Sequence, residues 1–228
     1  MNLEWAERVR GTKLYDLLAA VPLAVWFGRG MLNDSQSVPD HLRRIASHTE
    51  DLLGFLQLIA VAGSVIFCAL LLAMLVVRTT PRARAYGVMP RLLAFAGTFL
   101  GTGLLYCKPV PLTLPLQALA DILIIGSTVA AIVVLVWLGR AFAIMAEART
   151  LVTSGPYAIV RHPLYVVEEV GMIAMLIQFA SPLAFAIILA QLAVQISRTV
   201  YEERILAETF PEYASYQART ARFIPGVI

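Results

Sequence analysis

The segment 151–165 carries more polar and conformationally special residues than a plain connection between helices needs. Gly155 and Pro156 predict a turn, because glycine tolerates positive φ and proline fixes the next φ. Pro163 suits the first turn of a following helix, whose free N–H groups would point back toward Tyr157 and His162 and attract an anionic group. Arg161 and Tyr165 complete the segment. The alternative interpretation is an ordinary turn with a basic interfacial anchor and tyrosines of the aromatic belt.

Acidic residues follow this segment inside an apolar run. Glu168 and Glu169 lie about one helical turn into it, where ionisable side chains are costly and therefore indicate function. The alternative is that both carboxylates reach back to the membrane interface. Asp121 is a second candidate for a buried acid, but its place near the end of another apolar run favours a structural role.

The C-terminal tail repeats the mixture of charge and aromatic residues. Arg198 and Glu202 stand at i and i+4, as do Arg204 and Glu208, so each pair shares one helix face. Phe210-Pro211 predicts the end of this helix, and a short amphipathic piece follows as far as Arg222-Phe223-Ile224-Pro225. The alternative here is a solvated helix with ordinary salt bridges.

The composition excludes a soluble globular domain. Of the 228 residues 59% are hydrophobic and 14% charged, and the mean hydropathy is +0.76, whereas soluble domains carry about a quarter charged residues. Both cysteines lie in apolar runs without neighbours at metal-ligand spacing, so we expect no metal site. The net charge of +3 does not indicate nucleic acid, because the basic residues are distributed by membrane side.

Six apolar segments predict an all-α, polytopic membrane protein with about six transmembrane helices and a cytoplasmic C-terminal helical tail. The segments are 17–32, 52–77, 92–107, 112–138, 170–180 and 183–196. Residues 165–167 can lengthen the fifth segment if Glu168 and Glu169 face protein or water. Ser181-Pro182 predicts a tight turn between the last two, and 33–51 and 139–163 are expected to be the longer loops, outside and inside. With both termini in the cytoplasm, 14 of the 18 Lys and Arg residues lie on the cytoplasmic side, as the positive-inside rule requires. We expect the first segment to be retained, since no signal-peptidase pattern follows it.

The residue patterns resemble those of a known enzyme family. G-P-Y-x-x-x-R-H-P-x-Y, then E-E-x-x-L-x-x-x-F-x-x-Y-x-x-Y and a later R-x-x-P, are similar to the integral-membrane methyltransferases. That group includes isoprenylcysteine carboxyl methyltransferase and the phospholipid methyltransferases. The resemblance covers roughly 138–225. Two positions depart from it, because Val167 and Pro211 stand where the family frequently has glycine.

The resemblance implies an S-adenosylmethionine pocket at the cytoplasmic membrane face, within one integral-membrane domain, 1–228, whose cofactor-binding region is 139–228. By motif match, the cofactor would be held by Gly155, Tyr157, Arg161, His162, Pro163, Tyr165 and Glu203. Glu202 and Glu203 would contact its amino group or the reacting centre. We further predict that Arg198 and Arg222 orient an anionic acceptor, and that Glu168 and Glu169 face the substrate.

The predicted activity is methyl transfer to a lipophilic acceptor, either a lipid amine or a prenyl- or lipid-linked carboxylate, in the cytoplasmic (inner) membrane. An NADPH-dependent sterol-type reductase is one alternative, because that family shares a similar R-H-P-x-Y-x-G-E block. Val167 and the Glu202-Glu203 pair favour the methyltransferase. A non-enzymatic membrane scaffold is the other alternative, and it predicts that the polar residues tolerate alanine.

Overall fold

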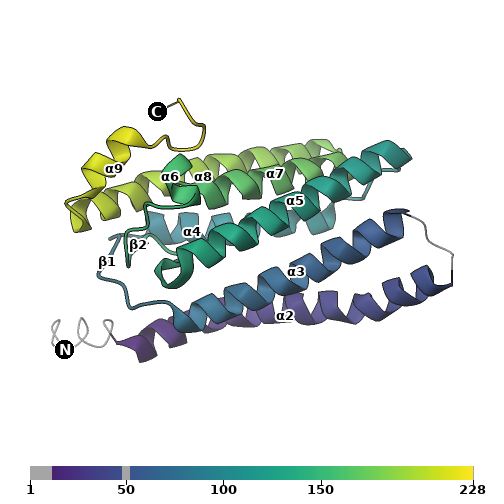
Figure 1. Cartoon of the computed structure of the whole chain (residues 1–228), viewed down its shortest axis with the longest axis horizontal. Helices are drawn as coiled ribbons and strands as arrows, with labels where there is room; N and C mark the ends of the chain where they lie inside the picture. Colours follow the sequence, from purple (N-terminus) through teal and green to yellow (C-terminus); the bar gives the residue numbers. More distant parts are fainter. Residues whose placement is uncertain (1–11, 48–51, 228) are drawn as a thin grey trace.

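The computed structural model describes residues 12–47 and 52–227 as a bundle of long helices (Figure 1). The long helices are α2 (Lys13–Ala46), α3 (Leu52–Val77), α4 (Met89–Phe99), α5 (Leu114–Leu138), α7 (Pro163–Phe179) and α8 (Pro182–Thr209). Shorter elements are the 3-10 helices η1 (Leu100–Tyr106) and η2 (Gly139–Ala141), the helices α6 (Pro156–Ile159) and α9 (Tyr213–Arg219), and the strands β1 (Ala83–Arg84) and β2 (Glu147–Ala148). The predicted all-α class is therefore confirmed, apart from one antiparallel pair of two-residue strands.

Several helix boundaries lie where the sequence predicts them. Pro163 opens α7, and Pro211 follows the end of α8. Ser181 caps α8, since its hydroxyl accepts a hydrogen bond from the backbone N–H of Ala184 at 3.1 Å, and Pro182 occupies the first turn. The predicted hairpin of α7 and α8 is thus confirmed.

The predicted outer loop 33–51 is wrong for most of its length, because α2 continues as a helix to Ala46. Backbone hydrogen bonding does not depend on apolar side chains, so a helix can run on after its hydrophobic segment ends. The hydroxyl of Ser64 on α3 also donates to Oδ2 of Asp34 at 2.6 Å, which fixes the polar half of α2 against its neighbour. Residues 48–51 of the predicted loop lie outside the described residues.

Three helical segments of the described chain are long and apolar enough to cross a membrane, and they are Leu52–Val77, Leu114–Ala141 and Pro182–Thr209. The other three predicted spans are helical, but α7 has 17 residues, α4 has 11 before it tightens into η1, and α2 carries charged and polar residues along its length. The six-span count therefore stays a prediction. Large apolar side chains such as Ile66, Val133 and Leu189 are exposed on the long helices, as expected of surfaces that face lipid.

The connections that carry the motifs gather at one end of the bundle, where Figure 1 shows β1, β2, α6 and α9 together. Asp16, buried near the start of α2, accepts from Arg78 at 3.0 Å and from Arg149 at 2.6 Å, and it joins α2 to two of these connections. Burial alone would raise the pKa of Asp16, but the hydrogen bond from Arg149 and the charges of Arg78, Arg149 and Lys13 lower it below 3.8. The ionised carboxylate thus holds the start of α2 against the connections that carry the motifs.

Candidate functional site

The tail after α9 lies directly against the 151–165 segment. Val160 and Ala221 form a parallel bridge, and the backbone N–H of Arg161 donates to the carbonyl of Ala221 at 2.8 Å. The hydroxyl of Tyr216 donates to the backbone carbonyl of Tyr157 at 2.7 Å. The two motifs, far apart in sequence, therefore form one structural unit.

Gly155 and Pro163 shape this unit without lining a cavity. Gly155 has a φ of +59°, and a Cβ at this position would lie 2.1 Å from the ring of Trp137 on α5. Both features demand glycine, since other residues are strained at positive φ and no space remains for a side chain. Pro163 is buried in the first turn of α7, where it follows the segment 139–162, which runs from η2 to α7 and which we call the connector. Their roles are thus conformational.

Glu203 is the centre of a buried ion-pair cluster. Its Oε1 accepts from Nε of Arg161 at 2.9 Å, and its Oε2 accepts from Nη2 of Arg222 at 2.7 Å. Nε2 of His162 lies 3.0 Å from the same Oε1. The hydrogen bond to Glu203 raises the pKa of Arg222, against the effect of burial. Glu203 thus joins α8, the connector and the tail, and it is not among the residues that line the cavity described next.

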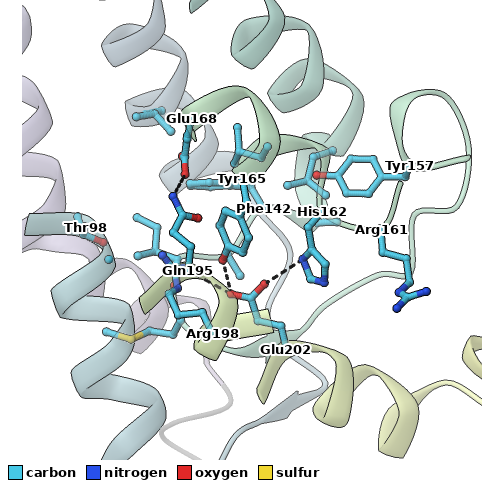
Figure 2. A pocket seen from close by; sticks show the side chains of 18 of the residues that line it. Thr98, Phe142, Tyr157, Arg161, His162, Tyr165, Glu168, Gln195, Arg198 and Glu202 are labelled. Atoms are coloured by element: carbon cyan, nitrogen blue, oxygen red, sulfur yellow. Dashed lines mark hydrogen bonds and ion pairs between the residues drawn. The ribbon is translucent and has the colours of Figure 1, made fainter. Parts of the chain in front are cut away.

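Glu202 has a different environment, although it is the adjacent residue. Figure 2 shows its carboxylate between the side chains of Tyr165 and His162, with Arg198 alongside. The hydroxyl of Tyr165 donates to Oε1 of Glu202 at 2.5 Å, and Nη2 of Arg198 lies 3.5 Å from the same oxygen. The rings of His162 and Tyr165 stack at 5.6 Å, and the guanidinium carbon of Arg198 lies 5.1 Å from the centroid of the Tyr165 ring. The cluster combines one carboxylate, one cation and two flat ring faces.

This cluster lines a cavity of about 500 Å³ between α4, α5, α7, α8 and the connector. Of the residues predicted for the site, those that line the cavity are Tyr157, Arg161, His162, Tyr165, Glu168, Arg198 and Glu202. Those that do not line it are Gly155, Pro163, Glu169, Glu203 and Arg222. The predicted Arg198–Glu202 pair forms, but both residues face the cavity and Arg198 is buried, so the solvated-helix interpretation is wrong for this pair. The Arg204–Glu208 pair is exposed, as that interpretation requires.

The cavity has lining residues that the sequence analysis did not single out. Gln191 and Gln195 extend its polar wall along α8 toward the middle of the bundle, and Thr98 of α4 lies nearby (Figure 2). Phe142, Tyr213 and Tyr216 add aromatic surface. The sequence does contain a signal for the two glutamines, because amide side chains at i and i+4 in an otherwise apolar span indicate one polar helix face. The sequence contains no such signal for the three aromatic residues, since whether they line the cavity depends on how the connector and the tail fold.

Comparison with known proteins gives a family and two partial relatives. The family model described as phospholipid methyltransferase matches residues 110–213. The cobalt-zinc-cadmium resistance protein CzcN of Cupriavidus metallidurans is 44% identical over 79 residues, which are 33% of this chain and 36% of that protein. The nickel-cobalt-cadmium resistance protein NccN of Alcaligenes xylosoxydans xylosoxydans is 39% identical over 84 residues, which are 35% of this chain and 38% of that protein. The match to each relative thus spans little more than a third of its length.

The family match includes α5, α7, α8 and the connector, which are the elements that enclose most of the cavity. It also contains the whole G-P-Y motif and the E-E motif as far as Tyr213. That resemblance is therefore confirmed, and residues 110–213 of this chain are a match to the phospholipid methyltransferase family.

Proposed function

We propose that this protein is a membrane methyltransferase that uses S-adenosylmethionine to methylate a lipophilic acceptor. The observation that carries the proposal is the meeting of the two family motifs at one cavity, where Tyr165 of the first motif donates to Glu202 of the second. The family match supports the methyltransferase over the sterol-type reductase.

The cavity residues suit the cofactor. A volume of about 500 Å³ lies in the range of small-molecule and cofactor sites. The methyl group that S-adenosylmethionine supplies is carried on a cationic sulfur, for which ring faces and carboxylates are the favourable neighbours. Tyr157, Tyr165 and His162 provide rings, and Glu202 provides a carboxylate. These four residues and Arg161 are those that would hold the cofactor.

The protein's part in such a transfer is positioning and charge management, because displacement at a methyl carbon needs no covalent nucleophile from the enzyme. Glu202 is held by Tyr165 and Arg198, so its carboxylate stays fixed toward the cavity. Glu203 does not line the cavity, and we assign it the role of fixing His162 and Arg161 in place. Arg222 shares this supporting role through its two hydrogen bonds to Glu203.

The acceptor would enter from the bilayer, and the cofactor from the cytoplasm. The cavity extends from the motif residues at the end of the bundle to apolar residues of α5 and α7 such as Ile124, Met172 and Met175. A carboxylate acceptor needs no base, whereas an amine must lose a proton, and Glu168 is the carboxylate placed within the cavity to accept it. Glu169 lies outside the lining, so we do not assign it to the acceptor.

The test is cofactor binding to the purified, detergent-solubilised protein. S-adenosylhomocysteine should bind and NADPH should not, and a labelled methyl group should pass from S-adenosylmethionine to a total lipid extract. Glu202→Gln should weaken S-adenosylhomocysteine binding about tenfold or more, since a hydrogen bond to a charged group contributes roughly 1.5–3 kcal/mol. Glu208→Gln is the matched control, because Glu208 lies on the same helix but is exposed and pairs with Arg204. Binding of NADPH alone would establish the reductase, and binding of neither would leave the scaffold.

A further inference from the structure

The side chain of Arg198 occupies the space beside Gly97 of α4, where any other residue would place its own side chain. A Cβ at Gly97 would lie 2.7 Å from Nη1 of Arg198 and 3.0 Å from its Cδ. Non-bonded heavy atoms pack at about 3.5–4.0 Å, so a side chain at this position and the arginine cannot both keep their places. The backbone of α4 therefore approaches Arg198 closely because residue 97 is glycine.

A hydrogen bond holds α4 and α8 at this separation. Nε2 of Gln191, two turns before Arg198 on α8, donates to the backbone carbonyl of Gly97 at 2.9 Å. This carbonyl lies in the last turn of α4, where helix carbonyls lose their intrahelical partners. Gln191 is 6% exposed, so the bond is shielded from water. The chain at Gly97 is thus tied to the same helix that carries Arg198, and α4 cannot withdraw from the arginine without breaking this bond.

The other terminal nitrogen of Arg198 makes the contacts that belong to the site. Nη2 donates to the backbone carbonyl of Ile144 at 2.8 Å and lies 3.5 Å from Oε1 of Glu202. The guanidinium carbon is 5.1 Å from the centroid of the Tyr165 ring. The place of the guanidinium is therefore set by α4 beside Nη1, and by the connector and Glu202 beside Nη2.

We propose that Gly97 is a positioning residue, whose lack of a side chain lets Arg198 reach Glu202 and the cavity. This role rests on the proposed function for the reaction that Arg198 serves. It extends the site beyond the family match, because α4 ends at Phe99 and the match begins at residue 110. The first half of the chain thus contributes to the site by a backbone that makes room, and not by a side chain that contacts the ligand.

Gly97→Ala should displace Arg198 more than it destabilises the fold. The added methyl group meets the outer part of a flexible side chain, which can move, and alanine is favoured over glycine within a helix. Relief of the 2.7 Å contact needs a shift of about 1 Å. A misplacement of about this size can lower a reaction rate up to roughly a hundredfold. We expect methyl transfer per folded molecule to fall about tenfold or more.

The experiment is a double-mutant cycle on the full chain in detergent. The variants are Gly97→Ala, Arg198→Ala and the two together, because Arg198→Ala removes every atom that the new methyl group would meet. Arg198→Ser, which also lacks these atoms, repeats the cycle. The matched control is Gly126→Ala, since Gly126 is a glycine of α5 that does not line the cavity and at which a Cβ would meet nothing within 4 Å. Thermal midpoint, S-adenosylhomocysteine binding and methyl transfer to a total lipid extract are measured for each variant.

We expect Gly97→Ala to lower methyl transfer about tenfold or more when Arg198 is present, and less than about twofold when Arg198 has been replaced. Gly126→Ala should change it less than about twofold. The change in thermal midpoint caused by Gly97→Ala should be at least about 2 °C more favourable without the arginine, because the clash is then absent.

The positioning role is overturned if Gly97→Ala lowers methyl transfer by the same factor in both backgrounds, or if it leaves transfer unchanged while Arg198 is present. Equal losses in Gly126→Ala and Gly97→Ala would overturn it as well. A different result belongs to the proposed function, which is refuted if the unaltered protein neither binds S-adenosylhomocysteine nor transfers a methyl group. The midpoint cycle then still decides whether Gly97 sets the place of Arg198.

Discussion

Exchanging Glu203 for glutamine should lower stability more than the same exchange at Glu202. Glu203 is 5% exposed and accepts hydrogen bonds from Arg161, from His162 and twice from Arg222. Glu203→Gln would leave the buried guanidinium of Arg161 without a counter-charge and replace one accepting oxygen by a donor. The variant therefore removes both a charge and an acceptor from a closed cluster.

The size of the effect follows from this burial. Breaking a buried ion pair by removing one partner costs about 3–5 kcal/mol. We expect a cost at the lower end of this range, about 3 kcal/mol, because the Arg222 side chain is 35% exposed and water can hydrate its guanidinium once the carboxylate is lost. In a protein of this length 1 kcal/mol corresponds to roughly 2–4 °C, so the thermal midpoint should fall by roughly 6–12 °C. Glu202→Gln should lower the free energy of unfolding by about half as much, ~1.5 kcal/mol, because Glu202 is 21% exposed and pairs with only one arginine, the buried Arg198.

The assay measures the thermal midpoint in detergent and S-adenosylhomocysteine binding per folded molecule, for both variants side by side. We expect Glu203→Gln to lose stability while the molecules that remain folded keep most of their binding. Glu202→Gln should lose binding per folded molecule and show the smaller fall in midpoint. A Glu203→Gln protein with an unaltered midpoint and abolished binding would refute the supporting role and return Glu203 to direct contact with the cofactor.

Three further predictions follow from the same cavity and its supports. Arg198→Gln should lower methyl transfer per folded molecule roughly a hundredfold. Arg222→Gln should lower the midpoint and spare activity per folded molecule, and both activities are measured on lipid extract. Reporters fused after residue 40 and after residue 222 should lie on opposite sides of the membrane, and a shared side would remove the first span. The pKa of the Asp16 carboxylate is lowered by folding, so the ionised carboxylate stabilises the folded protein above pH 3.8, and this stabilisation is lost as pH falls through the folded pKa. The difference in thermal midpoint between the unaltered protein and Asp16→Asn should therefore shrink below pH 3.8.

Much of the fold follows from hydropathy and helix-breaking residues. The apolar run 52–77 coincides with α3, and the turn at Ser181-Pro182 separates α7 from α8 as predicted. Hydropathy fails for α2, because its polar second half is a helix held by local backbone bonds and by contacts such as Asp34 with Ser64. Apolar length predicts where a helix can lie in lipid, and it carries no information on where the hydrogen-bonded helix ends.

The sequence predicts the segments that form the site more accurately than it predicts the side chains that face the cavity. The family motifs indicate the connector and the tail, and the structure brings them together through Tyr157 and Tyr216. Gly155 illustrates the limit, since its place in the motif suggests contact with the cofactor, whereas its positive φ and its contact with Trp137 give it a conformational role. A motif preserves both kinds of residue, and the sequence alone cannot separate them.

The pair Glu202-Glu203 shows why a structure is needed to tell ligand-contacting residues from supporting ones. Neighbouring residues on an α-helix are rotated by about 100° around its axis, so two identical side chains face different surroundings. On α8 this rotation directs Glu202 to Tyr165 and the cavity, and Glu203 to Arg161, His162 and the tail. The carboxylate of Glu202 is thus available to a ligand, whereas that of Glu203 is bonded to Arg161, His162 and the tail. The same rotation places Gln195 on the face of Glu202, seven residues or about two turns away, so that a polar wall extends from the motifs into the apolar half of the cavity.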